Sequence, residues 1–238
     1  MIRRMTWLPE VICDNISDLY DTAQYVDGKE TGSSNRNYKR NVEMKGNNHV
    51  ASQALFEDNW WTSGFAKRIF TKMISQPMFI KYSAEEELDG EKVGGFYAWH
   101  NDAPIMGGKQ SSLRSDYVMV TGINDQSEYE GGGLQIRLGS ETYEYRLSKG
   151  EAVFFDPTLW HAVKPVTKGE RKVCVVWIET LIQDPWAREL LLEYQDLETY
   201  CMNSIDRSKW EPDIDPQSYI QAIKYRIMRK YSSKFGVH

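Results

Sequence analysis

Seven short apolar or alternating runs between residues 78 and 180 constrain the fold of this chain more than any other feature. Glycine-containing turns separate these runs. Short runs in this arrangement are typical of antiparallel barrels and sandwiches rather than of βαβ units. We therefore predict a barrel or sandwich of about eight strands. The runs are MFIKYS, GFYAWHND, DYVMVTGIN, GLQIRL, TYEYRL, EAVFFD and RKVCVVWIET.

Segments with helical spacing flank this strand region. Apolar residues recur at that spacing over residues 10–26, and a second helix is expected near residues 59–74. Two segments after the strands, 184–202 and 215–231, begin with Asp-Pro, where aspartate can cap a helix and proline fits the first turn. The layout predicts one α+β domain over residues 1–238, with N-terminal helical support and a loop in 1–77, a barrel core in 78–183 and C-terminal helices in 184–238.

Composition excludes several classes of protein. The net charge of −5 gives no basic footprint for tight nucleic-acid binding. No apolar run approaches the roughly 20 residues of a membrane span, and the first residues contain no continuous apolar stretch typical of a secretory signal. The three cysteines are scattered, without C-x-x-C spacing. We therefore expect a cytoplasmic protein of enzyme size that neither spans a membrane nor binds nucleic acid.

A polar segment over residues 27–49 has two interpretations. It is rich in glycine, serine and asparagine, with a short strand expected near Val42, and it carries local positive charge. A solvated surface loop accounts for this composition, whereas a lid over an anionic ligand or substrate would also use the charge. The positive residues are Arg36, Lys39, Arg40 and Lys45.

Three residues could form a metal site. His100 and Asp102 are two apart, so on a strand their side chains point to the same face. His161 follows the apolar run that ends at Phe155, and distant antiparallel strands can meet across a barrel. Two histidines and one carboxylate form a facial triad that leaves positions open for non-haem Fe(II) oxygen chemistry, whereas a structural zinc site would have four protein ligands. Such spacing also occurs by chance.

Arg171 strengthens the metal interpretation. Strand alternation places Arg171, Val173, Val175 and Trp177 on one face and Lys172 on the other. If the Arg171 face points into the barrel, the buried guanidinium needs a carboxylate partner. Either an internal Asp or Glu supplies that carboxylate, or a dicarboxylate ligand bound beside the open metal site does.

The segment from about Met78 to Gln183 contains, in this order, the motifs YAWHND, LRSDYVMVTGIND, YEGGGLQI and LSKGEAVFFDPTLWHAVKPVTKGERKVCVVWI. With these motifs it resembles the Fe(II)- and 2-oxoglutarate-dependent dioxygenases, in particular the prolyl-4-hydroxylase-like group and its PKHD-type hydroxylases. The resemblance implies a double-stranded β-helix (jelly-roll) core. It makes His100, Asp102 and His161 the iron ligands, with no further catalytic residue. It also makes Arg171 and Tyr82 the residues that bind the distal carboxylate of 2-oxoglutarate.

The activity implied by this resemblance uses Fe(II), 2-oxoglutarate and O2. It hydroxylates a C–H bond, releases succinate and CO2, and favours a prolyl or other peptidyl substrate, while amino acids, small metabolites and modified nucleotides stay open. AlkB-like repair enzymes have a second arginine where this chain has Trp177, which argues against a nucleic-acid substrate. The alternative function is a metal-binding jelly-roll module without oxygenase turnover.

Several neighbouring residues have both a structural and a functional interpretation. Tyr97, Trp99 and Trp160 either pack the barrel or form the wall of a substrate pocket. Residues 103–116 are expected to form a mobile loop at the entrance, and His49 to lie at the surface rather than to bind metal. The family's usual Gly-Gly-Glu is three glycines here, residues 131–133, and we expect the missing acid to affect local packing or substrate binding rather than iron.

Overall fold

The computed structural model describes residues 1–31, 38–45, 48–56, 60, 63–88, 90–108, 111–204 and 216–232. Two compact units divide the chain: one contains residues 1–63 and 73–179, and the other contains residues 64–72 and 180–238. The expectation of a single functional domain over residues 1–238 stays a prediction. In the described part of the chain, no helix is both long enough and apolar enough to cross a membrane.

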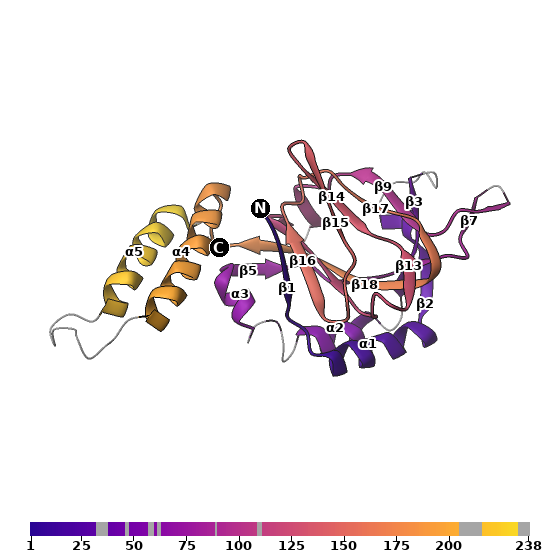
Figure 1. The fold of residues 1–238 in the computed structure, drawn as a ribbon, viewed down its shortest axis with the longest axis horizontal. Helices are drawn as coiled ribbons and strands as arrows, with labels where there is room; N and C mark the ends of the chain where they lie inside the picture. The colour runs from indigo at the N-terminus through magenta and orange to yellow at the C-terminus, as the bar shows by residue number, and fades with distance from the viewer. Residues whose placement is uncertain are drawn as a thin grey trace. The chain divides into compact units, whose positions relative to one another are not determined.

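The first unit is built on two large antiparallel sheets (Figure 1). The larger sheet pairs its strands in the order β1 (Ile2–Thr6), β16 (Glu151–Phe155), β12 (Tyr117–Gly122), β18 (Val166–Thr180), β6 (Met78–Ser83), β4 (Val42–Lys45) and β2 (Gln24–Asp27). The smaller sheet has the order β15 (Glu141–Tyr145), β14 (Leu134–Leu138), β17 (His161–Val163), β9 (Phe96–His100) and β3 (Lys39–Arg40). All seven runs identified in the sequence form strands, which confirms the prediction of a largely antiparallel core with flanking helices.

Shorter strands complete the described sheets. Those that also pair with β18 are β13 (Tyr129–Gly131) and β5 (Thr71–Ile74). The two-stranded sheets join β10 (Ile105–Gly108) to β11 (Ser111–Arg114), and β7 (Glu87–Leu88) to β8 (Glu91–Lys92).

Consecutive strands of the core alternate between the two large sheets. β6 belongs to the larger sheet, β9 to the smaller, β12 to the larger, β14 and β15 to the smaller, β16 to the larger, β17 to the smaller and β18 to the larger. Apolar side chains from both sheets form one buried cluster, for example Val120 and Phe155 from the larger sheet and Leu134 and Ile136 from the smaller. Strands distant in sequence are thereby brought together around a common interior.

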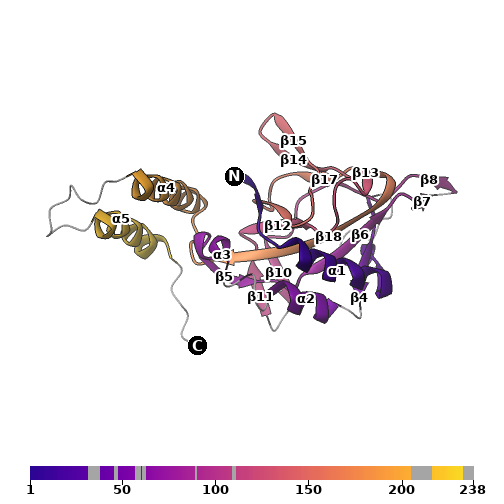
Figure 2. The same cartoon turned by 60° about the horizontal axis from the view of Figure 1, so that its bottom comes forward.

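The described helices and the 3-10 turn have the following bounds. They are α1 (Glu10–Thr22), η1 (Gly28–Thr31), α2 (Asn48–Phe56), α3 (Gly64–Arg68), α4 (Pro185–Ser204) and α5 (Pro216–Tyr231). In the first unit, α1 and α2 lie side by side (Figure 2). In the second unit, the side chain of Asp184 caps α4 by accepting a hydrogen bond from the Ala187 amide at 2.8 Å, as the Asp-Pro motif predicts. Asp215, the expected cap of α5, lies outside the described residues.

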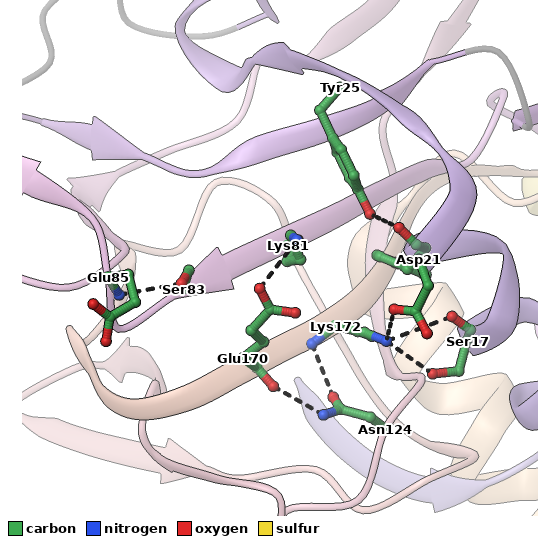
Figure 3. Close-up of polar contacts among 10 residues, drawn as sticks. Ser17, Asp21, Tyr25, Lys81, Ser83, Glu85, Asn124, Glu170 and Lys172 are labelled. Carbon is green, nitrogen blue, oxygen red and sulfur yellow. Dashed lines mark hydrogen bonds and ion pairs between the residues drawn. The ribbon is translucent and has the colours of Figure 1, made fainter.

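Helix α1 covers the outer face of the larger sheet, and Lys172 of β18 ties it there. The Lys172 ammonium lies 3.2 Å from the carboxylate of Asp21 and 3.3 Å from the hydroxyl of Ser17 (Figure 3). Because side chains alternate along a strand, the neighbouring Arg171 points to the opposite face, into the space between the sheets. The alternation predicted for β18 is therefore confirmed.

Two N-terminal predictions are wrong. The helix expected over residues 10–26 ends at Thr22, and residues 24–27 form β2, which pairs with β4. The helix expected over residues 59–74 is reduced to α3, because the backbone of Phe70 has a φ of 53° and the chain continues as β5. Residues 1–77 thus contribute strands as well as helices.

Candidate metal centre

Two neighbouring strands of the smaller sheet bring the candidate metal ligands together. His100 at the end of β9 pairs directly with His161 at the start of β17, and Asp102 follows β9 by two residues. The Oδ1 atom of Asp102 lies 3.8 Å from Nε2 of His100 and 3.6 Å from Nε2 of His161. One donor atom from each residue lies within 4.8 Å of the other two. His100 and His161 are 61 residues apart in the sequence, and the pairing of β9 with β17 brings them together. Two imidazoles and a carboxylate are a donor set that fits a divalent metal.

The two imidazoles are oriented by carbonyl groups of their own strands. Nδ1 of His100 lies 2.7 Å from the carbonyl oxygen of Ala98, and Nδ1 of His161 lies 2.8 Å from that of Leu159. A carbonyl oxygen only accepts hydrogen bonds, so each Nδ1 carries the hydrogen and donates it. Nε2 of each ring therefore keeps its lone pair, and both lone pairs are available to a metal.

Trp177 holds the third candidate ligand. Its indole Nε1 donates a 2.9 Å hydrogen bond to Oδ2 of Asp102, which leaves Oδ1 as the oxygen that faces both imidazoles. Burial opposes ionisation of Asp102, but the contacts with His161 and Trp177 outweigh it and hold the pKa of Asp102 below its usual value. The aspartate is therefore a carboxylate at neutral pH, with one oxygen committed to the indole.

His100 is neutral at physiological pH. Burial, together with the neighbouring His161, lowers the pKa of His100 from 6.5 to about 4. Its ring also stacks on Tyr97, with 3.6 Å between ring centroids and 16° between planes. A neutral, stacked imidazole is ready to bind a metal ion without first losing a proton.

A cavity of about 370 Å³ lies between the two sheets and contains the triad. Its wall combines apolar side chains from both sheets with a group of polar and charged ones, as in small-molecule sites. The polar or charged side chains in the lining are Thr31, Lys39, Tyr82, Tyr97, His100, Asn101, Asp102, His161, Arg171 and Trp177.

Arg171 is the second notable feature of this cavity. Its side chain is only 2% exposed, and Nε and Nη2 have no hydrogen-bond partner among the described residues. Tyr82, directly opposite it on β6, lies beneath the guanidinium, with 5.2 Å from ring centroid to Cζ. Buried guanidinium nitrogens without partners are costly, so a bound anion would stabilise Arg171 in this position. Of the two partners that the sequence allowed, the described structure favours a ligand over an internal carboxylate.

Comparisons with known proteins match the part of the chain that contains this site. The model of the 2OG-Fe(II) oxygenase superfamily matches residues 82–179, which include the triad, Tyr82 and Arg171. A PKHD-type hydroxylase of Synechococcus sp. (strain CC9605) is 31% identical over 162 residues, which cover 66% of this chain and 71% of that protein. The chain belongs to the 2OG-Fe(II) oxygenase superfamily, in its PKHD-type hydroxylase group.

Two further proteins extend the match beyond these residues. A PKHD-type hydroxylase of Sphingopyxis alaskensis is 26% identical over 234 residues, covering 94% of this chain and 98% of that protein. The fold is similar to that of a prolyl hydroxylase from Trichoplax adhaerens, solved with a hypoxia inducible factor peptide fragment, with a TM-score of 0.51 and 14% identity over 75% of this chain and 83% of that chain.

Family membership confirms the predicted activity. The protein is an Fe(II)- and 2-oxoglutarate-dependent oxygenase that hydroxylates a C–H bond, using O2 as the oxidant. A metal-binding module without turnover is not favoured.

The three aromatic residues near the triad occupy different places. Tyr97 lines the cavity, where burial raises its pKa to about 12 and keeps its hydroxyl protonated. The ring of Trp99 instead stacks with Arg137, 4.8 Å from centroid to Cζ, and Trp160 is 50% exposed. Neither Trp99 nor Trp160 is among the described residues that line the cavity. Of the three, the described cavity lining includes Tyr97, and a substrate role for Tyr97, Trp99 and Trp160 stays a prediction.

The entrance region and the stray histidine are also placed. Residues 103–116, which follow Asp102 and were expected to form a mobile loop, contain the paired strands β10 and β11. Met106 of β10 lines the cavity. His49 is exposed on α2, so the expected surface position is confirmed.

Gly133, the last of the three glycines that stand where the family usually has Gly-Gly-Glu, lies next to the side chain of Glu144. A Cβ atom at Gly133 would lie 2.3 Å from a carboxylate oxygen of Glu144 on the neighbouring strand. Glu144 in turn forms a 2.6 Å ion pair with Lys164. Neither contact involves the triad, and the expectation that the missing acid affects local packing or substrate binding rather than iron stays a prediction.

Sequence reasoning missed a buried charged pair in the cavity wall. Lys39 is 3% exposed and Glu43 is 5% exposed, and their charged groups lie 2.8 Å apart. The polar composition of residues 27–49 suggested a solvated loop, whereas this part of it is buried and lines the cavity. The positive charge noted in the sequence was the only signal of such a role.

Proposed function

We propose that this oxygenase hydroxylates a prolyl or other residue of a peptide, with Fe(II) held by His100, Asp102 and His161. One observation carries the assignment of the site: an open triad of two imidazoles and a carboxylate shares one cavity with the buried guanidinium of Arg171, whose Nε and Nη2 have no hydrogen-bond partner among the described residues. A facial triad leaves metal positions for a chelating keto acid and oxygen. When bound, Fe(II) supplies the oxygen activation that 2-oxoglutarate decarboxylation drives.

The protein's own contribution is orientation. The carbonyls of Ala98 and Leu159 fix the imidazoles, and Trp177 fixes the carboxylate, so the three donors converge without rearrangement. This preorganisation supports the proposal that the three residues act as one metal site.

Arg171 and Tyr82 are proposed to bind the distal carboxylate of 2-oxoglutarate. The guanidinium offers donors in a planar fork that matches a carboxylate. Burial raises the pKa of Tyr82, so its hydroxyl stays protonated and can donate a hydrogen bond to the same carboxylate. Val173 and Val175, which follow Arg171 on the same face of β18, line the same cavity and give it an apolar surface next to the guanidinium.

The peptide substrate is supported by the relatives. The curated relatives are named PKHD-type hydroxylases, and the similar Trichoplax adhaerens enzyme was solved with a peptide fragment. We also propose that the two alternating sheets form the double-stranded β-helix of the family, because consecutive strands alternate between them. A cytoplasmic location is supported by the three cysteines, all of which are free.

A peptide library tests this function. Purified enzyme with Fe(II), 2-oxoglutarate and O2 is incubated with N-acetylated, C-amidated peptides that contain proline, and mass spectrometry detects a gain of one oxygen atom. We expect one or more peptides to be hydroxylated with matching succinate formation, and His161→Ala to abolish both. Oxygen gain that persists in His161→Ala, or a library in which no peptide gains oxygen, would contradict the proposal.

A further inference from the structure

Lys39 and Thr31 form part of the cavity wall, and Lys39 is paired with the buried Glu43. The ammonium of Lys39 donates to Oε1 of Glu43 at 2.8 Å and to the hydroxyl of Thr31 at 3.3 Å. The Thr31 hydroxyl itself donates to the same Glu43 oxygen. Lys39 and Thr31 line the cavity, and Glu43 neutralises the charge from behind them. An ammonium has three N–H groups, and the described residues accept two of those of Lys39, which leaves one donor for a ligand.

Lys39 lies close to the proposed iron site. Its ammonium is 5.1 Å from the ring centroid of Tyr97, and the same ring stacks on His100 at 3.6 Å. β3 also pairs directly with β9, with Lys39 opposite Tyr97. A single side chain, Tyr97, therefore contacts both the ammonium and a proposed metal ligand.

The two cations of the described cavity lining suit different ligands. Nε and Nη2 of Arg171 have no partner in the part of the chain that the structure describes, so the guanidinium can take up the full charge of a carboxylate. Lys39 is already paired with Glu43 in a buried position, and a second carboxylate beside it would be repelled by the first. A neutral acceptor such as an amide carbonyl avoids that repulsion and still accepts the remaining N–H.

The position of Lys39 in the chain separates it from the shared chemistry of the family. The family model matches residues 82–179, a range that contains every residue proposed here to bind iron or 2-oxoglutarate. Lys39, Thr31 and Glu43 all precede that range. A polar group in the cavity that the iron and the keto acid do not require is available for the molecule to be hydroxylated.

We propose that Lys39 is a specificity-determining residue that donates a hydrogen bond to a backbone carbonyl of the peptide substrate. Glu43 and Thr31 hold the ammonium in place and cancel its charge, so a neutral peptide group is preferred to an anion. This inference rests on the peptidyl hydroxylation proposed above, and it adds a chemical reason for the choice of an amide-containing substrate.

Two double variants test the proposal without leaving a buried charge unpaired. Lys39→Met/Glu43→Leu removes both charges and the donor, whereas Lys39→Gln/Glu43→Gln removes the charges but keeps a donor. A buried ion pair can often be replaced by apolar side chains of similar size without loss of stability. Urea unfolding establishes that each variant is folded. Lys81→Met is the matched control, because Lys81 pairs with Glu170 at 3.0 Å and is absent from the described cavity lining (Figure 3).

The readout is the KM for a peptide that the wild-type enzyme hydroxylates, measured alongside the KM for 2-oxoglutarate. For Lys39→Met/Glu43→Leu we expect the peptide KM to rise about ten- to a hundredfold, the loss typical of a hydrogen bond to a charged group. For Lys39→Gln/Glu43→Gln we expect a smaller rise, about two- to tenfold. The KM for 2-oxoglutarate should change by less than about twofold, and Lys81→Met should change neither constant.

Each other outcome overturns the inference in a distinguishable way. An unchanged peptide KM in both double variants would make the pair purely structural. A rise in the KM for 2-oxoglutarate as large as that for peptide would place Lys39 in the co-substrate site. Equal peptide KM values for the two double variants would remove the hydrogen bond from the explanation. A wild-type enzyme that hydroxylates no peptide would instead refute the proposed function itself.

Discussion

Replacing Arg171 by methionine should have opposite effects on stability and on ligand binding. The guanidinium is 2% exposed, and two of its nitrogens have no partner in the described structure. Each buried polar group without a partner costs about 1–3 kcal/mol, and methionine keeps much of the aliphatic volume without that cost. We therefore expect Arg171→Met to leave the free energy of unfolding of the metal-free protein unchanged or to raise it by about 1–3 kcal/mol.

The same substitution should weaken binding of 2-oxoglutarate. It removes a charge-assisted pair in a buried site and leaves the carboxylate of the ligand without its cation. Breaking such a pair costs about 3–5 kcal/mol, which corresponds to a loss in affinity of roughly a hundredfold or more.

Urea unfolding of the metal-free protein and an anaerobic titration of the Fe(II) form with 2-oxoglutarate measure the two effects. Arg114→Met is the control with the opposite sign, because Arg114 makes two 2.7 Å hydrogen bonds to the buried carboxylate of Asp116. Its loss should destabilise the fold by about 2–5 kcal/mol and leave affinity for 2-oxoglutarate unchanged. If Arg171→Met instead destabilised the fold and left the affinity for 2-oxoglutarate unchanged, Arg171 would form an internal ion pair. Our interpretation of the cavity would then be refuted.

Two other perturbations test the metal site. The pKa of His100 is about 4 in the folded protein and 6.5 in the unfolded chain, so between these pH values the unfolded chain binds a proton that the folded protein does not. The free energy of unfolding of the metal-free protein should therefore fall by about 3 kcal/mol as the pH decreases from 6.5 to 4. Urea unfolding between pH 4.5 and 7 measures this pH dependence, which should be lost in His100→Gln and kept in the exposed His49→Gln. If the urea midpoints of the two variants depended equally on pH, the assignment to His100 would be contradicted. Trp177→Phe removes the hydrogen bond to Oδ2 of Asp102 and should weaken Fe(II) binding about 10- to 100-fold in a chelator competition, whereas unchanged affinity would show that the indole does not position the carboxylate.

The strands and the triad follow from patterns that sequence makes visible. Period-two alternation places Arg171 and Lys172 on opposite faces, and the structure has Arg171 in the cavity and Lys172 against α1. The spacing of His100 and Asp102 on one face was readable for the same reason. The alternation of side chains along a strand follows from backbone geometry, so it does not depend on contacts with distant parts of the chain.

The features that the sequence concealed depend on contacts between distant segments. Residues 71–74 carry an apolar pattern compatible with a helix, but they form β5, which pairs with β18. Lys39 belongs to a polar segment, and only pairing of β3 with β9 buries it. The hydrogen bond from Trp177 to Asp102 joins residues 75 apart, and no local pattern predicts such a partner.

The most direct test of the metal centre is an anaerobic titration of the purified metal-free protein with Fe(II) and then 2-oxoglutarate, followed by visible absorption. We predict a weak charge-transfer band that appears only when both are present, because the keto acid must chelate a metal with open positions beside His100, Asp102 and His161. The band should be lost in His161→Ala. Iron binding without any band on addition of 2-oxoglutarate, or a band unaffected by His161→Ala, would contradict the open triad on which this account depends.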